Sequence, residues 1–170
     1  MAIHQASEYN LPLFVNFIDF KAAFDSINRG FIWAAFKYYG LPDKYIRILR
    51  SFFDGTVSAV RWAGGLSEWF EVLSGTGQGD IQGPVVFNVC LNLAVELSEA
   101  HGSPSRGLVL RQEGDSVETV LDCDYADDMA VMDSTEAGLQ ESTDLICKFF
   151  EYAGLKVNTK KTQNRGHGCC

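Results

Sequence analysis

Residues 121–132 read Leu-Asp-Cys-Asp-Tyr-Ala-Asp-Asp-Met-Ala-Val-Met, with apolar-tending segments on either side of an Asp pair. This pattern predicts two short strands joined by a tight turn. Because neighbouring side chains on a strand point to opposite faces, Asp127 and Asp128 share one small volume only where the chain bends. Two carboxylates in one place repel unless a cation lies between them, and Mg²⁺ or Mn²⁺ suits such oxygen ligands. An isolated Asp pair is more often a solvated turn, so the interpretation depends on the rest of the chain.

The composition indicates a folded chain with one core. Of its 170 residues, 46% are hydrophobic and 12% are aromatic, which excludes a disordered chain. The sequence has no apolar run as long as a membrane span and no signal-peptide pattern, so we expect an intracellular, soluble protein. The net charge of −8 is unusual for a protein that binds nucleic acid.

The first third of the chain predicts a strand followed by two helices. Residues 14–20 are rich in β-branched and aromatic side chains, which indicates a buried strand with the carboxylate of Asp19 at its end. We expect Asn28 to cap a helix over residues 31–39, and a second helix to cover residues 42–53. The apolar side of this second helix would consist of Tyr45, Ile46, Leu49, Phe52 and Phe53.

The remaining elements follow from turn residues and apolar periodicity. Residues 56–73 predict a hairpin, and a glycine-rich loop then leads into a buried helix over residues 84–100. After the acidic hairpin, Asp133 and Glu136 resemble a capping box that would begin the last long helix. A short strand is expected over residues 155–158.

This order of elements predicts an α+β fold with a split βαβ pattern, an antiparallel sheet backed by helices. The ends of the first and third strands can lie side by side in such a sheet. Asp19 would then join Asp127 and Asp128, and three carboxylates from two distant segments would form a two-metal site for phosphoryl transfer. We found no internal repeat or linker, so we expect one domain over residues 1–170.

Four segments occur in a specific order along the chain. They read Phe-Ile-Asp-Phe-Lys-Ala-Ala-Phe-Asp-Ser from residue 17, Gly-Gln-Gly to Gly-Pro and Phe-Asn over 77–88, Tyr-Ala-Asp-Asp from residue 125, and Gly-Leu-Lys-Val-Asn-Thr-Lys-Lys-Thr from residue 154. Together they resemble the palm motifs of reverse transcriptases, which are RNA-directed DNA polymerases. The likeness is nearest to the non-LTR retrotransposon type, related to group II intron enzymes, and spans about residues 14–162.

The resemblance implies a metal centre and a nucleotidyl transfer. Asp19 and Asp127 would bind two Mg²⁺ or Mn²⁺ ions with help from the Phe20 carbonyl, and Asp128 would lie nearby in a supporting position. A primer 3′-hydroxyl would attack the α-phosphate of a deoxynucleotide triphosphate. Lys161 matches the lysine of the fourth motif, and it would donate a proton to the leaving pyrophosphate.

The resemblance also implies a nucleotide pocket. Phe24 would lie under the sugar of the incoming nucleotide, while Gln78 and Gly79 would line the nucleotide and template pocket. The family often has a serine just before the proline of the second motif, whereas this chain has Gly83, which would loosen that loop.

An RNA template and a DNA primer are the partners that the resemblance implies, with no membrane involved. No Lys or Arg precedes Lys21 and eight residues follow Thr162, so most of the fingers and thumb are expected outside this stretch, in a longer polyprotein. Their absence would account for the acidic net charge, because those parts carry the basic surfaces. A nuclear location would be consistent with a retrotransposon product.

Two other readings remain. A viral-type RNA polymerase usually has Gly before the Asp pair and no bulky residue at the position of Phe24, so this sequence fits that class poorly. A decayed or domesticated remnant that serves as a binding or structural module is the second alternative. The intact Asp19, Asp127 and Asp128 argue against long decay.

Overall fold

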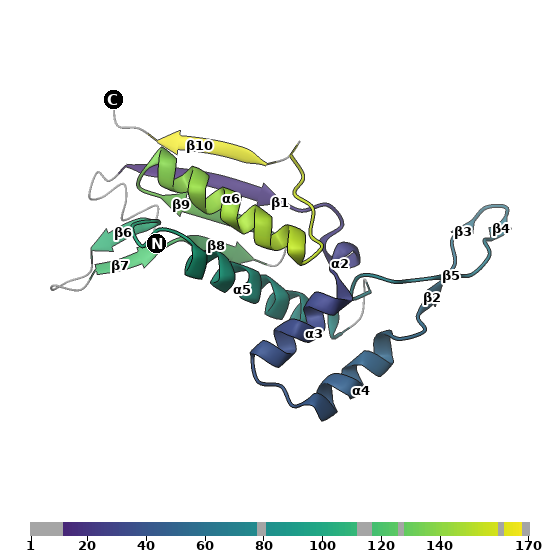
Figure 1. Cartoon of the computed structure of the whole chain (residues 1–170). Helices are drawn as coiled ribbons and strands as arrows, with labels where there is room; N and C mark the ends of the chain where they lie inside the picture. Colours follow the sequence, from purple (N-terminus) through teal and green to yellow (C-terminus); the bar gives the residue numbers. More distant parts are fainter. Residues whose placement is uncertain (1–11, 78–80, 112–116, 126–127, 160–161, 168–170) are drawn as a thin grey trace.

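The computed structural model describes residues 12–77, 81–111, 117–125, 128–159 and 162–167. Its centre is a four-stranded sheet in the order β10-β1-β9-β8, with every neighbouring pair antiparallel (Figure 1). The strands are β1 (Leu13–Asp19), β8 (Asp122–Tyr125), β9 (Asp128–Asp133) and β10 (Gln163–His167). The predicted combination of helices with an antiparallel sheet is therefore confirmed.

Two long helices, α5 (Gly83–His101) and α6 (Glu136–Tyr152), pack on each other and on one face of this sheet. Alternate residues of β1 and β9, such as Ile18 and Val131, meet the buried rings of Phe87 and Phe150 in this core. Burying one such side chain stabilises the fold by about 1.5–3 kcal/mol. None of the helices in the described ranges is long and apolar enough to cross a membrane.

The other face of the sheet is covered at one end by a hairpin of β6 (Leu108–Arg111) and β7 (Val117–Val120). A second, smaller core forms there, and its buried members are Leu13, Val15, Leu108 and Met132. Further along β1 on the same face, Phe17 is 44% exposed. Among the residues that the structure describes, the end of β1 that carries Asp19 is therefore the more open part of this face.

Beyond β1, the short helix α2 (Ala23–Ser26) comes first, and then α3 (Arg29–Tyr38) and α4 (Asp43–Phe53) lie close to the positions predicted for the two helices. The Asn28 side chain accepts a hydrogen bond from the backbone N–H of Gly30, which confirms the predicted cap. The predicted apolar side of α4 is only partly right. Ile46 and Phe53 are buried, whereas Tyr45 is 53% and Phe52 is 62% exposed, because no described element covers that side of the helix.

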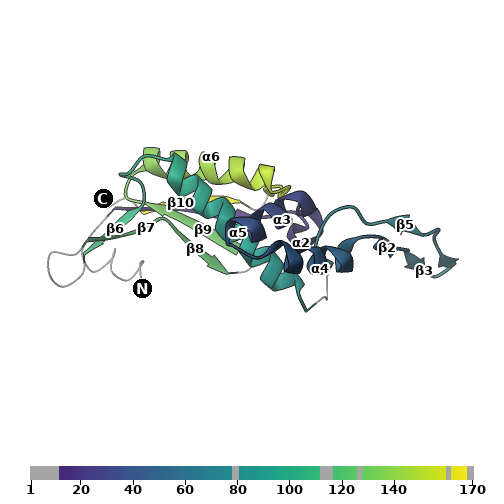
Figure 2. The same ribbon diagram turned by 60° about the horizontal axis from the view of Figure 1, so that its bottom comes forward.

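The predicted hairpin over residues 56–73 is confirmed as two short ladders. The outer ladder joins β3 (Arg61–Trp62) to β4 (Gly65–Leu66), and the inner ladder joins β2 (Val57–Ser58) to β5 (Phe70–Glu71). Figures 1 and 2 both show this hairpin extending as an arm from the rest of the molecule.

The predicted capping box at Asp133 and Glu136 is wrong. Helix α6 is capped by Thr135, whose side chain accepts a hydrogen bond from the backbone N–H of Gly138. The Asp133 carboxylate is buried, and it instead accepts hydrogen bonds from the backbone N–H groups of Gly107 and Thr135. Asp133 therefore ties the loop before β6 to the start of α6.

The predicted strand over residues 155–158 is also wrong. That segment makes one isolated bridge, between Val157 and Phe20. The strand that pairs with this edge of β1 is the next element along the chain, β10. The backbone N–H and the hydroxyl of Thr162 both donate to the carbonyl of Asn158, at 3.0 and 3.1 Å. These bonds hold Thr162, the residue before β10, close to the bridged segment, and the sequence pattern contained no signal for this contact.

Two glycines with nearly equal backbone angles allow a matched test of the packing around α2. Gly154 has φ +85° and Gly40 has φ +80°, but an added Cβ at Gly154 would meet the Ser26 carbonyl oxygen at 2.8 Å, whereas at Gly40 it would meet nothing. We expect Gly40→Ala to lower the free energy of unfolding by about 1–2 kcal/mol, from backbone strain alone. Gly154→Ala should cost roughly 1–3 kcal/mol more, because a backbone contact must open. Urea unfolding measures both, and equal losses would contradict the packing described for Gly154.

Candidate active site

Two of the three predicted carboxylates lie directly opposite each other in the sheet. Asp19, the last residue of β1, pairs in register with Asp128, the first residue of β9. Residues opposed in this way on antiparallel strands point to the same face, with Cβ atoms about 4.5–5.5 Å apart. The predicted meeting of the first and third motifs is therefore confirmed for Asp19 and Asp128. Asp19 is half-buried and Asp128 is exposed.

This arrangement has an electrostatic cost. Like charges directly opposite each other destabilise a sheet, and a cation between them removes the repulsion. A hard divalent ion with oxygen ligands fits this pair, since it accepts carboxylates from two strands and takes further ligands from substrate or water. Asp127, the third predicted ligand, lies outside the described residues. Among those that are described, no group of three or more His, Cys, Asp or Glu side chains forms a complete metal site.

On its other side, Asp19 is held by Asn158. The backbone N–H of Asn158 donates to the Asp19 carbonyl at 2.7 Å, and its side-chain amide donates to Oδ2 of Asp19 at 2.8 Å. Asn158 was not predicted as a site residue, because its partner is 139 residues away along the chain and the contact depends on the register of the fourth motif against β1. Asp19 therefore lies between a carboxylate on β9 and an amide on the segment before β10.

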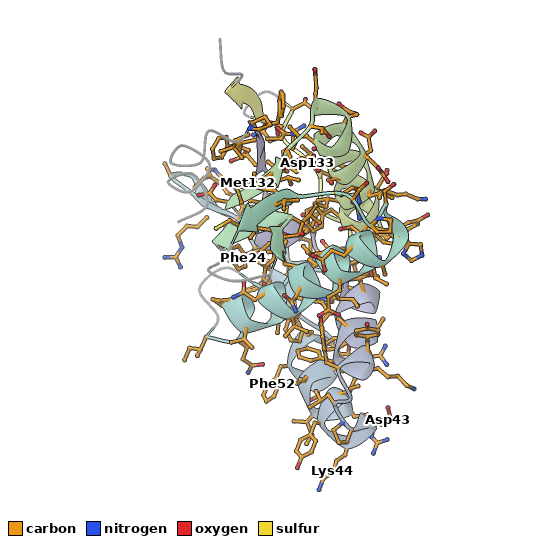
Figure 3. The ribbon with its side chains drawn as sticks, turned by 90° about the vertical axis from the view of Figure 1, so that its left-hand side faces the viewer. Phe24, Asp43, Lys44, Phe52, Met132 and Asp133 are labelled. Carbon is orange, nitrogen blue, oxygen red and sulfur yellow. The ribbon has the colours of Figure 1, made fainter. Side chains whose placement is uncertain are left out.

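Phe20 and Phe24 follow Asp19 in the chain, and their rings differ in burial and in the aromatic ring that each contacts. The Phe20 ring is buried and contacts the Phe150 ring edge-on, with 4.9 Å between centroids, so only its backbone is available to the site. The Phe24 ring is half-buried, and its centroid lies 4.6 Å from that of the fully buried Phe87. In the view of Figure 3, Phe24 lies between Met132 and Asp133 on one side and the labelled residues of α4, namely Asp43, Lys44 and Phe52, on the other.

The glycine loop packs against the backbone of α2. The backbone N–H of Thr76 donates to the Phe24 carbonyl at 2.9 Å, and Gly75 has φ +81°. A Cβ on Gly75 would lie 2.7 Å from the same carbonyl oxygen and from Cα of Asp25, so only glycine fits there. The loop that leads into the second motif therefore contacts the first motif at the position of Phe24.

The other predicted site residues, Gln78, Gly79 and Lys161, lie outside the described residues, so their placement stays a prediction. Among the described residues, Gly77 directly precedes Gln78, and Thr162 directly follows Lys161. Gly77 has its carbonyl oxygen 3.3 Å from where a Cβ of Gly83 would lie, which leaves little room for a larger residue at position 83.

The charge of the chain is unevenly distributed. Residues 29–62 contain six of the 14 Lys and Arg side chains but only two of the 22 Asp and Glu. Five of these cations are exposed on α3, α4 and the arm, namely Lys37, Lys44, Arg47, Arg50 and Arg61. The segment of residues 29–62 is therefore locally basic in a chain whose net charge is −8.

Comparison with known proteins identifies relatives of the whole chain. The family described as "Reverse transcriptase (RNA-dependent DNA polymerase)" matches residues 3–167. The retrovirus-related Pol polyprotein from type-2 retrotransposable element R2DM of Drosophila melanogaster is 26% identical over 144 residues, which is 85% of this chain and 13% of that protein. The corresponding polyprotein from type-1 retrotransposable element R2 of Popillia japonica is 21% identical over 85% of this chain and 23% of that protein. The chain thus spans less than a quarter of these two relatives.

Solved structures share the fold at low sequence identity. A telomerase from Candida albicans, in complex with a fragment of telomeric RNA, superposes with a TM-score of 0.72 over 99% of this chain and 29% of that one, at 12% identity. An apo telomerase from Candida tropicalis gives a TM-score of 0.67 over 99% of this chain and 34% of that one, at 17% identity. These similarities support a polymerase palm-like fold.

Proposed function

Because the chain belongs to the reverse transcriptase family, of the type found in non-LTR retrotransposons, we propose that it catalyses RNA-directed DNA synthesis as the palm of a larger polymerase. The observation that carries this proposal is the direct opposition of Asp19 and Asp128 at the end of two neighbouring strands. A polymerase palm needs carboxylates from two distant segments at one point, and this register supplies them.

In the proposed reaction, a small set of residues holds the metal ions and supplies the proton. Two divalent ions, Mg²⁺ or Mn²⁺, would supply activation of the primer 3′-hydroxyl and neutralise the charge of the triphosphate. Asp19, Asp127 and the Phe20 carbonyl would hold these ions, with Asp128 beside them. Lys161 would protonate the leaving pyrophosphate, as general acids do in such transfers.

The nucleotide pocket would be formed by the first and second motifs together. Phe24 would support the sugar of the incoming deoxynucleotide, and Gln78 and Gly79 would line the adjoining template pocket. The contacts of Thr76 and Gly75 with the backbone of Phe24 and Asp25 support this arrangement, since they join the loop that leads into the second motif to the first motif at that position.

The finer fold assignment is a split βαβ sheet of the ferredoxin-like kind. Numbered in chain order, the strands of the central sheet are arranged 4-1-3-2, which supports this assignment. We further propose that residues 1–170 form a single partial reverse transcriptase domain, with the palm motifs over about residues 14–162 and the fingers and thumb elsewhere in a longer polyprotein.

The proposed partners are an RNA template, a DNA primer and deoxynucleotide triphosphates. The exposed cations of residues 29–62 support a nucleic-acid partner, because phosphate backbones bind to clustered Lys and Arg. The remaining surface is acidic, so we expect the 170-residue chain alone to bind primer–template weakly and to extend no primer.

A chimaeric polymerase tests the proposed activity. Residues 14–162 would replace the matching segment of the Drosophila relative, and extension of a DNA primer on an RNA template would be measured. We expect extension that requires a divalent ion and is lost in the matched chimaera with Asp19→Asn and Asp127→Asn.

A chimaera that folds cooperatively and binds primer–template, yet extends nothing, would contradict the proposed activity. Such a result would favour the alternative that the chain is a decayed or domesticated module that binds or scaffolds without catalysis.

The same chimaera tests Phe24 as a filter against ribonucleotides. A bulky ring under the sugar leaves no room for a 2′-hydroxyl, and Phe87 behind the ring prevents it from moving aside. We expect Phe24→Val to raise the ratio of ribonucleotide to deoxynucleotide incorporation at least tenfold, a difference of about 1.4 kcal/mol, while deoxynucleotide use survives.

If Phe24 is only a core residue, Phe24→Val should lower the melting temperature and leave the incorporation ratio unchanged. The melting temperature measured beside the ratio therefore separates a lost contact with the sugar from a lost contact with Phe87.

A further inference from the structure

We propose that Asn158 is a positioning residue for the metal site, and that it orients the Asp19 carboxylate for ion binding. This inference rests on the proposed function, and it assigns a role to a residue of the fourth motif that neither metal nor substrate need touch. The supporting observation is that Asn158 binds Asp19 twice, through its backbone and through its side chain.

The backbone contact fixes where the side chain of Asn158 lies. Two hydrogen bonds, from Asn158 N–H to the Asp19 carbonyl at 2.7 Å and from Lys21 N–H to the Lys156 carbonyl at 2.8 Å, flank the bridge between Phe20 and Val157. In this antiparallel register Asn158 lies directly opposite Asp19, just as Asp128 does on the other side. The three side chains therefore form one row across neighbouring segments, in the order Asp128, Asp19, Asn158.

The side-chain contact fixes the orientation of the carboxylate. A carboxylate on its own rotates about χ2 with little preference. The amide of Asn158 donates to Oδ2 at 2.8 Å, which holds that oxygen on the β10 side. The second oxygen, Oδ1, is then directed away from Asn158. An amide is suited to this position, because it donates to the carboxylate without adding a charge that repels the ion or a carboxylate that competes for it.

The segment that carries Asn158 is itself held at both ends. Before it, Gly154 packs against the backbone of Ser26 and Asn28, and Leu155 is buried. After it, Thr162 donates two hydrogen bonds to the Asn158 carbonyl. The amide is therefore presented to Asp19 by a fixed backbone, and removal of the amide leaves that backbone in place.

Binding of MnCl₂ to the 170-residue chain, measured from the free-ion signal in electron paramagnetic resonance, tests this role. We expect Asn158→Ala and Asn158→Leu, the second of which keeps the branching at Cγ but cannot donate a hydrogen bond, to raise the dissociation constant for Mn²⁺ about tenfold, which is the low end of the effect of removing a hydrogen bond to a metal ligand. The matched control is Thr162→Val, which removes a hydrogen bond to the same residue but keeps the amide. It should lower the melting temperature and leave the Mn²⁺ affinity within about twofold of the wild type.

Asp19→Asn separates failure of this inference from failure of the proposed function. If Asp19→Asn abolishes Mn²⁺ binding while both Asn158 variants bind as the wild type does, the metal site stands and the role of Asn158 is overturned. If Thr162→Val weakens binding as much as Asn158→Ala, the effect is one of loop stability and the role is again overturned. If Asp19→Asn binds Mn²⁺ as the wild type does, both the metal site and this inference are wrong.

Discussion

The candidate site depends on the register of the central sheet, which places two like charges opposite each other. Asp19 and Asp128 are opposed because the strands that carry them are aligned by their buried faces. Ile18, Met129 and Val131 all enter the helix-covered core, and a slip of one residue would turn them outward and expose them. Burial of each such side chain is worth about 1.5–3 kcal/mol, more than the roughly 0.2–1 kcal/mol typical of a cross-strand pair of side chains. The core therefore imposes the register, and the register imposes the repulsion, which a divalent ion would relieve.

Two glycines with positive φ, from different segments, bring the rest of the site to the same point. Gly75, in the loop just before the second motif, packs against the backbone of Phe24 and Asp25, and Gly154 of the fourth motif packs against that of Ser26 and Asn28. Both glycines therefore pack closely against the backbone in and next to the short helix α2, and a side chain at either glycine would force the segments apart. These contacts explain in physical terms why motifs far apart in the sequence meet around Asp19 and Phe24.

The sequence predicted those parts of the fold that have local causes. The cap at Asn28 and the hairpin over residues 56–73 follow from turn and capping chemistry, and they were predicted correctly. The pairing of Asp19 with Asp128 followed from the order of elements and the resemblance together. Errors arose where long-range contacts decide the structure: Asp133 is a buried acceptor for Gly107 instead of a cap, and the contact of Asn158 with Asp19 depends on a register that no local pattern encodes. Tyr45 and Phe52 were predicted on the apolar side of the second helix and are exposed, because periodicity identifies an apolar side but not whether it is covered.

Thermal melting of the 170-residue chain and of Asp128→Asn, each without metal and with MnCl₂, tests the central claim most directly, with Asp144→Asn on the exposed side of α6 as the control. The account predicts that Asp128→Asn melts higher than the wild type without metal, because the repulsion with Asp19 is gone. It also predicts that Mn²⁺ stabilises the wild type and Asp144→Asn more than Asp128→Asn, through preferential binding to the folded state. An equal response to Mn²⁺ in all three proteins, together with a lower melting temperature of Asp128→Asn in the absence of metal, would contradict the account.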